Sequence, residues 1–175
     1  MPLKTHDVLV TGLSRGAPCG WLASGALRYP VALGRGGRRA IKREGDGATP
    51  IGAWAAVGVL YRADRVARPR TLLPIGTISQ ASGWCDAAAD RNYNRPVRLP
   101  YPASAESLWR DDDLYDVLVL LDHNRRPRVR GLGSAIFMHC ASEGLQPTAG
   151  CIALARHHLV ALLSWLRPGQ RILVL

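Results

Sequence analysis

The sequence has no long hydrophobic run, and this absence bears on whether the chain can cross a membrane as a helix. None of its segments approaches about 18 uninterrupted apolar residues, which excludes a membrane-spanning helix. Met1–Asp7 carries a lysine and then an acid where a signal peptide needs an apolar stretch, so no export signal is expected. Disorder is also excluded, because 47% of the 175 residues are hydrophobic and only 21% are charged. The length predicts a single domain over residues 1–175.

Lysine and aromatic residues are also scarce, which bears on the meaning of the net charge of +10. Only Lys4 and Lys42 are lysines among the 23 basic residues, and the arginines are spread along the chain. Aromatic residues make up 6% of the chain, and no segment interleaves them with basic residues as base-stacking proteins do. We therefore expect no nucleic-acid partner. A scattered arginine surface suits a carboxylate-rich polymer.

The four cysteines form no closely spaced pair, so the sequence predicts neither a zinc site nor another metal site. Cys19, Cys85 and Cys140 are expected to be buried, inert thiols. The glycine-rich stretches 34–37 and 131–133 complete neither a P-loop nor a dinucleotide-binding turn, and we interpret both as turns between strands. No cofactor is expected.

The hydrophobic pattern predicts a mainly β fold with one or two helices, arranged as a sandwich or an open barrel. One helix is expected at Arg156–Leu166, because four leucines from Leu159 to Leu166 form one apolar stripe. Residues 62–115 give no clear pattern. The predicted strands are Asp7–Leu13, Cys19–Ser24, Ala26–Leu33, Gly52–Tyr61, Asp116–Asp122, Ser134–Cys140 and Arg171–Leu175.

Candidate catalytic residues lie in and after the strand predicted at Ser134–Cys140. Alternation along a strand puts His139 on one face and Cys140, with Met138, on the other, so Cys140 is expected in the core. Cys151 follows a loop long enough to return to this strand, and it precedes the predicted helix, where backbone N–H groups are free. Gly150 lets the backbone approach a ligand. A thiol beside an imidazole is the arrangement for nucleophilic acyl transfer, although a structural histidine remains an alternative.

The wording of these segments resembles a known family. Ile136-Phe-Met-His139, followed by Pro147-Thr-Ala-Gly-Cys-Ile-Ala-Leu154, is similar to the signature of the L,D-transpeptidase (YkuD-like) catalytic domain, in which a histidine precedes Ser/Thr-x-Gly-Cys. The resemblance covers roughly residue 32 to the end. Further blocks that look like a compact bacterial branch of this family are Lys42–Gly52, Asp90–Asn94, Leu108–Arg110 and Gly133–Phe137.

The resemblance implies a YkuD-like β-sandwich or open barrel with a cysteine acyl-transfer site. Cys151 would be the nucleophile and His139 its proton acceptor, while Thr148, Ala149 and Gly150 would position the acyl group or supply the oxyanion site. Such enzymes cleave the bond before D-alanine in peptidoglycan tetrapeptide stems, and carbapenem-type inhibitors are expected ligands. An amine of a second stem would resolve the thioester and cross-link the cell wall.

This chain departs from the family pattern at two positions. Ala149 stands where the family often has histidine, and Ala153 stands where it often has arginine. The arginine candidates to replace that substrate clamp are Arg39, Arg91, Arg95, Arg110 and Arg156. The full set of candidate substrate-binding residues is Tyr93, Asn94, Arg95, Trp109, Arg110 and Arg156.

Two other interpretations remain open. The same scaffold could trim stems as an L,D-carboxypeptidase with water as the acceptor, or it could be a non-catalytic wall- or nucleic-acid-binding domain. The resemblance implies the periplasm or cell envelope, whereas the start at Met1, if native, implies the cytoplasm.

Overall fold

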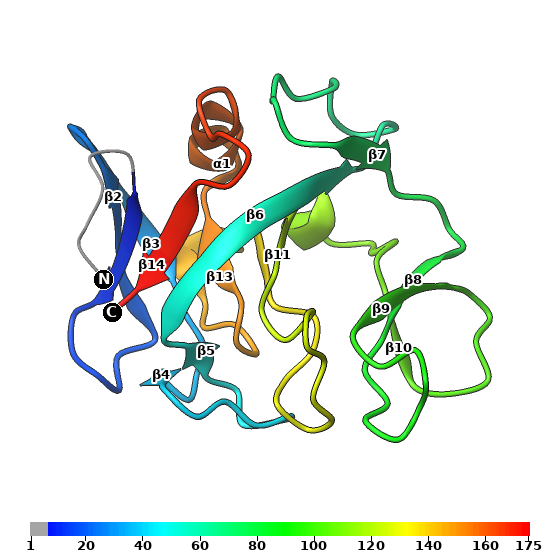
Figure 1. Ribbon diagram of the computed structural model, residues 1–175. Coiled ribbons are helices and arrows are strands. Elements are labelled where there is room, and N and C mark those ends of the chain that lie inside the picture. Colours follow the sequence, from blue (N-terminus) through cyan, green and yellow to red (C-terminus); the bar gives the residue numbers. More distant parts are fainter. Residues whose placement is uncertain (1–6) are drawn as a thin grey trace.

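The computed structural model describes residues 7–175 as a β-rich molecule with one α-helix (Figure 1). Residues 1–6, and with them most of the segment considered for an export signal, lie outside the described residues. Nine strands form the main sheet, in the order β11-β12-β13-β3-β2-β1-β14-β6-β7. Their bounds are β1 Val8–Gly12, β2 Cys19–Ser24, β3 Leu27–Ala32, β6 Gly52–Tyr61, β7 Ile75–Thr77, β11 Val117–Leu121, β12 Phe137–Cys140, β13 Ile152–Leu154 and β14 Arg171–Val174.

The main sheet closes on itself. β6 pairs with β14 along one edge and with β11 along the other, so the hydrogen-bonded circuit from β11 through β13, β3 and β14 returns to β11. The join between β13 and β3 is a single residue pair, Ala153 with Ala32. The prediction of a mainly β fold is confirmed, and the sheet is a barrel closed through one narrow seam.

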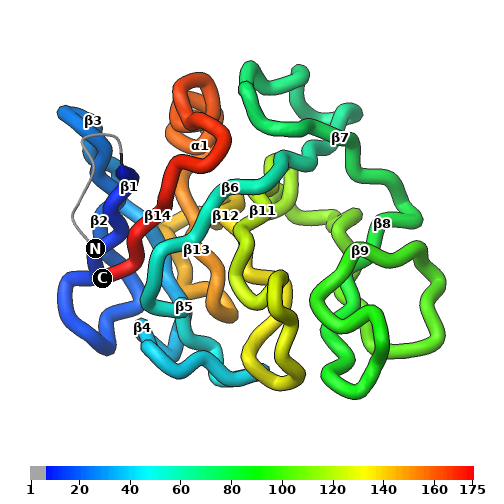
Figure 2. Tube along the Cα trace, viewed as in Figure 1, coloured from blue at the N-terminus to red at the C-terminus, as the bar shows by residue number. Residues whose placement is uncertain are grey.

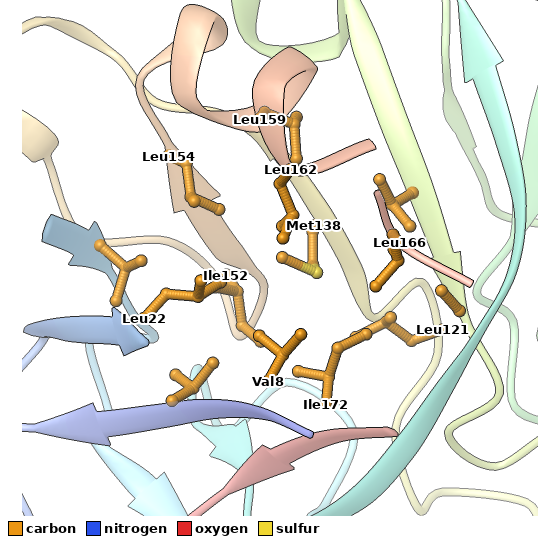
Figure 3. Packing of buried hydrophobic residues seen from close by; sticks show 14 of the residues in the cluster. Val8, Leu22, Leu121, Met138, Ile152, Leu154, Leu159, Leu162, Leu166 and Ile172 are labelled. Carbon is orange, nitrogen blue, oxygen red and sulfur yellow. The ribbon is translucent and has the colours of Figure 1, made fainter. Parts of the chain in front are cut away.

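The helix α1 spans Arg156–Leu163 and covers the core of this barrel. Its leucines and the following Leu166 are fully buried, as the apolar stripe predicts. The helix is shorter than predicted because the amides of Ser164 and Trp165 bond to carbonyls three residues back, which tightens the chain into a turn. The helix side chains face strand residues that include Val8, Leu22, Met138, Ile152 and Ile172 (Figure 3).

A second, smaller sheet and two short helical turns occupy the region for which the sequence gave no clear pattern. In this sheet the order is β10-β8-β9, and a further pair, β4 and β5, lies near the start of β6. The bounds are β4 Arg38–Arg39, β5 Thr49–Pro50, β8 Ser82–Cys85, β9 Arg95–Arg98 and β10 Ala105–Ser107; the 3₁₀ turns are Asp113–Tyr115 and Glu143–Leu145.

A second apolar cluster joins the small sheet to the outer face of β11 and β12. Phe137 contacts Trp84 and Tyr115 edge to face, with ring centroids 5.0 and 6.3 Å apart. Met138, the next residue, lies in the barrel core, so neighbouring side chains of β12 face opposite sides as predicted. Cys151 belongs to the second cluster. The outer face of β12 is therefore where the candidate residues lie.

Candidate active site

His139 and Cys151 are placed by two parallel neighbouring strands. β12 and β13 pair in parallel with His139 opposite Ala153, and Cys151 lies two residues before Ala153, just ahead of β13. Residues two apart share a face, so His139 and Cys151 are diagonal neighbours on the same face. Both line one cavity of about 580 Å³.

Two threonine hydroxyls hold the carbonyl of Cys151. The Thr148 hydroxyl donates to it at 2.7 Å and accepts from the Gly150 amide at 3.1 Å, which closes the turn before the cysteine. The Thr49 hydroxyl donates to the same carbonyl at 3.3 Å and accepts from the Gly34 amide at 2.8 Å. Both threonines are buried. The cysteine backbone is thus tied to β5 and to the loop after β3.

Only glycine fits at position 150. Its φ is +136°, and a Cβ built there would lie 2.8 Å from the Ala48 carbonyl oxygen. The turn is also docked on the loop after β3, where Thr148 N–H donates to the Leu33 carbonyl and Arg35 N–H donates to the Thr148 carbonyl, each at 2.9 Å. The sequence predicts that the backbone at Gly150 approaches a ligand, whereas in the structure it closely approaches the backbone of Ala48.

The Cys151 thiol is buried and makes two hydrogen bonds. Its Sγ donates to the Ala135 carbonyl at 3.2 Å and accepts from the Phe137 amide at 3.4 Å. Burial raises the pKa of Cys151 to about 12, against a smaller lowering by the Phe137 amide. The resting side chain is therefore a neutral thiol at pH 7.

The His139 ring is held in one orientation, with one ring nitrogen left to accept a proton. Its Nδ1 lies 2.8 Å from the Cys140 carbonyl, which fixes the proton on Nδ1 and leaves Nε2 as the acceptor. Burial lowers the pKa of His139 to about 4, so the imidazole is neutral at pH 7. The Tyr115 ring stands edge-on, 5.4 Å from the imidazole centroid. Cys140 packs in the barrel core, as predicted.

Backbone N–H groups at the cysteine are available, although not for the reason predicted. Within residues 7–175, the N–H groups of Ala149 and Cys151 have no acceptor in the protein, whereas that of Gly150 donates to Thr148. Cys151 does precede the helix, as predicted, but β13 lies between them, so these amides are not those of the helix N-terminus. The available amides belong to a tight turn before a strand.

One wall of the cavity is a polar cluster on Tyr115. The Tyr115 hydroxyl donates to the Glu106 carboxylate, and the Arg110 guanidinium lies over the Tyr115 ring, 5.1 Å from its centroid. Arg110 also pairs with Asp112 through two hydrogen bonds of 2.9 and 2.6 Å. Burial raises the pKa of both Glu106 and Tyr115. Arg110 is thus the predicted arginine that the fold brings into the cavity, and its charge already has partners.

Sequence reasoning missed the cavity residues Arg35, Glu44 and Asp86. Arg35 is exposed and, within the described part of the chain, its side chain makes no ion pair. It lies in the glycine-rich stretch 34–37, which does form a turn, since the Gly37 amide donates to the Gly34 carbonyl. No sequence signal separated this arginine from the others of the chain.

The other predicted substrate-binding residues do not line the cavity. Tyr93 is buried and its hydroxyl donates to Glu44, while Asn94 accepts from the Ala135 amide at 3.1 Å and so holds the segment that contacts Cys151. Trp109 stacks under Arg62 at 3.5 Å. Arg156 bonds to Asp116 at 2.7 Å, and Arg39, Arg91 and Arg95 are exposed elsewhere.

All four cysteines lie within the described residues. All four thiols are free; Cys85 and Cys140 are buried as predicted, whereas Cys19 is only half-buried. No group of three His, Cys, Asp or Glu side chains within residues 7–175 is placed to hold a metal ion. No helix in that range is long and apolar enough to cross a membrane.

Comparison with known proteins identifies the family of this chain. The L,D-transpeptidase catalytic domain family, YkuD, matches residues 22–174. No curated protein matches the chain. One similar solved structure is an L,D-transpeptidase from Mycobacterium smegmatis, with 14% identity and a TM-score of 0.43 over 97% of this chain and 58% of that one. The family match spans most of the sequence, and the chain belongs to the L,D-transpeptidase catalytic domain family.

Proposed function

We propose that this protein is a cysteine L,D-transpeptidase that acts on peptidoglycan tetrapeptide stems through a Cys151 thioester. The observation that carries the proposal is the placement of His139 and Cys151 on one face of β12 and β13, inside one cavity. The free amides of Ala149 and Cys151 support it, because acyl transfer needs donors for the oxyanion. Membership of the family supplies the substrate class.

In the proposed reaction, Cys151 Sγ attacks the carbonyl carbon of the bond before D-alanine while His139 Nε2 takes the thiol proton. The carbonyl oxygen becomes an oxyanion that the Ala149 and Cys151 amides stabilise. Collapse breaks the C–N bond, and His139 returns the proton to the departing D-alanine amine. A second stem's amine then attacks the thioester, giving an amide and restoring the thiol.

The pKa shifts support a first proton transfer that is late, when the substrate is already bound. The pKa of Cys151 is raised to about 12 and that of His139 is lowered to about 4, so a thiolate–imidazolium pair is not the resting state. The thiol must also leave the Ala135 carbonyl to reach the imidazole. We infer that the proton moves as the sulfur–carbon bond forms, after the substrate has entered the cavity.

Arg35 is the residue we propose to bind the substrate carboxylate in place of the arginine that the family often has at position 153. Ala153 lines the cavity opposite His139 and brings no charge. Arg110 belongs to the block Leu108–Arg110 that resembles the family, but its charge is already paired with Asp112 and lies close to Glu106. Arg35 is exposed at the same cavity without an ion pair in residues 7–175, so its guanidinium can take a carboxylate through two parallel hydrogen bonds.

We further propose that residues 1–175 act as one catalytic domain in the cell envelope, where peptidoglycan is found. The YkuD match supports a single domain because it covers residues 22–174, and the family's peptidoglycan substrate supports the location in the cell envelope.

Product analysis with a disaccharide-tetrapeptide tests the function. Transpeptidation predicts a cross-linked dimer and released D-alanine, whereas hydrolysis predicts a disaccharide-tripeptide with D-alanine and no dimer. Cys151→Ala should abolish both products, and Cys140→Ala, a buried thiol on the opposite face, should retain them. A dimer formed equally well by Cys151→Ala would refute the proposal, and tripeptide alone would replace transpeptidation by carboxypeptidase activity.

A further inference from the structure

A hollow lined by arginines lies apart from the cysteine cavity. It has a volume of about 550 Å³ and is formed by the loop between β1 and β2 and by the segment around β4, which lie side by side in Figure 2. We call it the arginine hollow. Its lining residues are Arg15, Gly16, Gly36, Arg38, Arg39, Ala40 and Ile41. None of them lines the cavity that holds Cys151.

The packing of the two loops holds these arginines together. The Arg38 amide donates to the Arg15 carbonyl at 3.1 Å, and Arg38 Nη2 donates to the Ser14 carbonyl at 3.0 Å. Two glycines permit this contact: a Cβ at Gly37 would lie 2.7 Å from the Arg15 carbonyl oxygen, and one at Gly12 would lie 2.7 Å from Arg38 Nε. The guanidinium of Arg38 is therefore anchored on one side.

The positive charges of the arginine hollow are not neutralised by any carboxylate of the described residues. Within residues 7–175, no carboxylate forms an ion pair with Arg15, Arg38 or Arg39, although Arg62, Arg110 and other arginines of the chain are paired. Arg38 Nε is buried and has no hydrogen-bond acceptor among the residues that the structure describes. Burial, and then repulsion by Arg15, lowers the pKa of Arg38. A bound anion would stabilise this guanidinium, because it would supply both the missing hydrogen-bond acceptor and the opposite charge.

We propose that the arginine hollow binds a phosphate group, with Arg38 at its centre and Arg15 and Arg39 at its rim. Phosphate suits a hollow lined by three arginines better than a planar carboxylate does, because it presents more acceptor oxygens and carries up to two charges. The phosphate can belong to a lipid headgroup or be free. Leu13 and Ile41, which are 69% and 71% exposed, lie on the same two segments and would contact the apolar part of a lipid.

Two probes test the proposal: inorganic phosphate, followed by calorimetry, and vesicles of phosphatidylglycerol in phosphatidylcholine, followed by sedimentation. The test variant is Arg15→Gln with Arg39→Gln, since both side chains are exposed and their loss should leave the fold intact. The matched control removes the same charge by Arg68→Gln with Arg70→Gln, two exposed arginines outside the hollow. Thermal unfolding verifies that both variants fold.

We expect the native protein to bind at least one probe, and the test variant to bind it more weakly by about fivefold per arginine at low salt. The control should keep native affinity. Binding of inorganic phosphate identifies a free phosphate; binding confined to the anionic vesicles and weakened by Ile41→Ser identifies a lipid headgroup. Failure to bind either probe, or an equal loss in the control, would overturn the proposal.

Discussion

Thr49→Val tests whether the cysteine turn depends on a hydroxyl from a distant strand. Thr49 is 1% exposed, and its hydroxyl joins two segments by accepting from the Gly34 amide and donating to the Cys151 carbonyl. Valine keeps the shape but removes both bonds. The Gly34 amide is then left without an acceptor at a buried position.

The expected loss of stability follows from that amide. A buried donor without a partner costs about 1–3 kcal/mol, whereas the Cys151 carbonyl keeps its second bond, from Thr148 at 2.7 Å. A decrease of about 2 kcal/mol in the free energy of unfolding lowers the Tm of a chain of this size by about 4–8 °C. Thr77→Val is the matched control, because Thr77 is exposed on β7 and its replacement should change the free energy by less than about 0.5 kcal/mol.

The same substitution should slow the chemistry while leaving the nucleophile in place. Cys151 loses one of the two hydroxyls that hold its carbonyl, and a displacement of about 1 Å can cost up to about 100-fold in rate. The assay is the rate of covalent acylation by a carbapenem, followed by intact mass. Combining Thr49→Val with Thr148→Val should give more than additive losses, because both hydroxyls bond to the same oxygen. If Thr49→Val matched Thr77→Val in both Tm and acylation rate, the reasoning would be refuted.

Three further predictions concern His139, Gly150 and Arg35. The pKa of His139 in the folded protein is about 4, below its ordinary value near 6.5, so its contribution to stability is full above about pH 6.5 and falls by roughly 3 kcal/mol as the pH drops through 4. In His139→Gln, denaturant unfolding should lack this part of the decline, and identical pH profiles would contradict the prediction. Gly150→Ala should lower the free energy of unfolding by at least about 1–3 kcal/mol, since a Cβ would meet the Ala48 carbonyl at 2.8 Å. Gly16→Ala is the control, because a Cβ there lies in open space, and it should unfold like the native protein. Equal Tm values for the two variants would argue against the close packing at Gly150. Arg35→Gln should raise KM for a tetrapeptide stem about tenfold or more with a smaller change in kcat, and a KM as unaffected as in Arg70→Gln would remove Arg35 as the clamp.

The longer strands, which are mainly apolar segments bounded by turn residues, could be predicted from the sequence. β2 and β6 have the predicted bounds, and β1, β3, β11 and β14 differ by one or two residues at their ends. The strand predicted at Ser134 begins three residues later, at Phe137, because Ala135 takes a φ of +52° and its carbonyl turns toward Cys151. Local propensity does not encode that contact.

Short elements stabilised by distant partners could not be predicted. β13 has three residues and pairs with β12 and β3, so nothing in its own length distinguishes it from a loop before the helix. The strands of the small sheet have three or four residues each and depend on the packing of Trp84 against Phe137.

In the candidate site, too, some residues could be predicted from contiguous sequence and others depend on contacts between distant segments. His139 and Cys151 were found because alternation along β12 and the motif before Cys151 are properties of contiguous sequence. The loops after β3 and β12 meet at an isolated bridge between Gly34 and Thr148. Only this contact brings the Thr49 hydroxyl to the Cys151 carbonyl and Arg35 to the cavity. Such contacts link residues about 100 positions apart, which no local pattern in one sequence reveals.

The most direct test of the central claim is covalent labelling of Cys151. A carbapenem should add its whole mass to the purified protein, because attack of the thiol opens the β-lactam ring without a leaving group. Peptide mapping should place the adduct on Cys151; Cys151→Ala should abolish it, and Cys140→Ala should retain it. An unmodified native protein, or an adduct that persists in Cys151→Ala, would contradict a catalytic role for this cysteine.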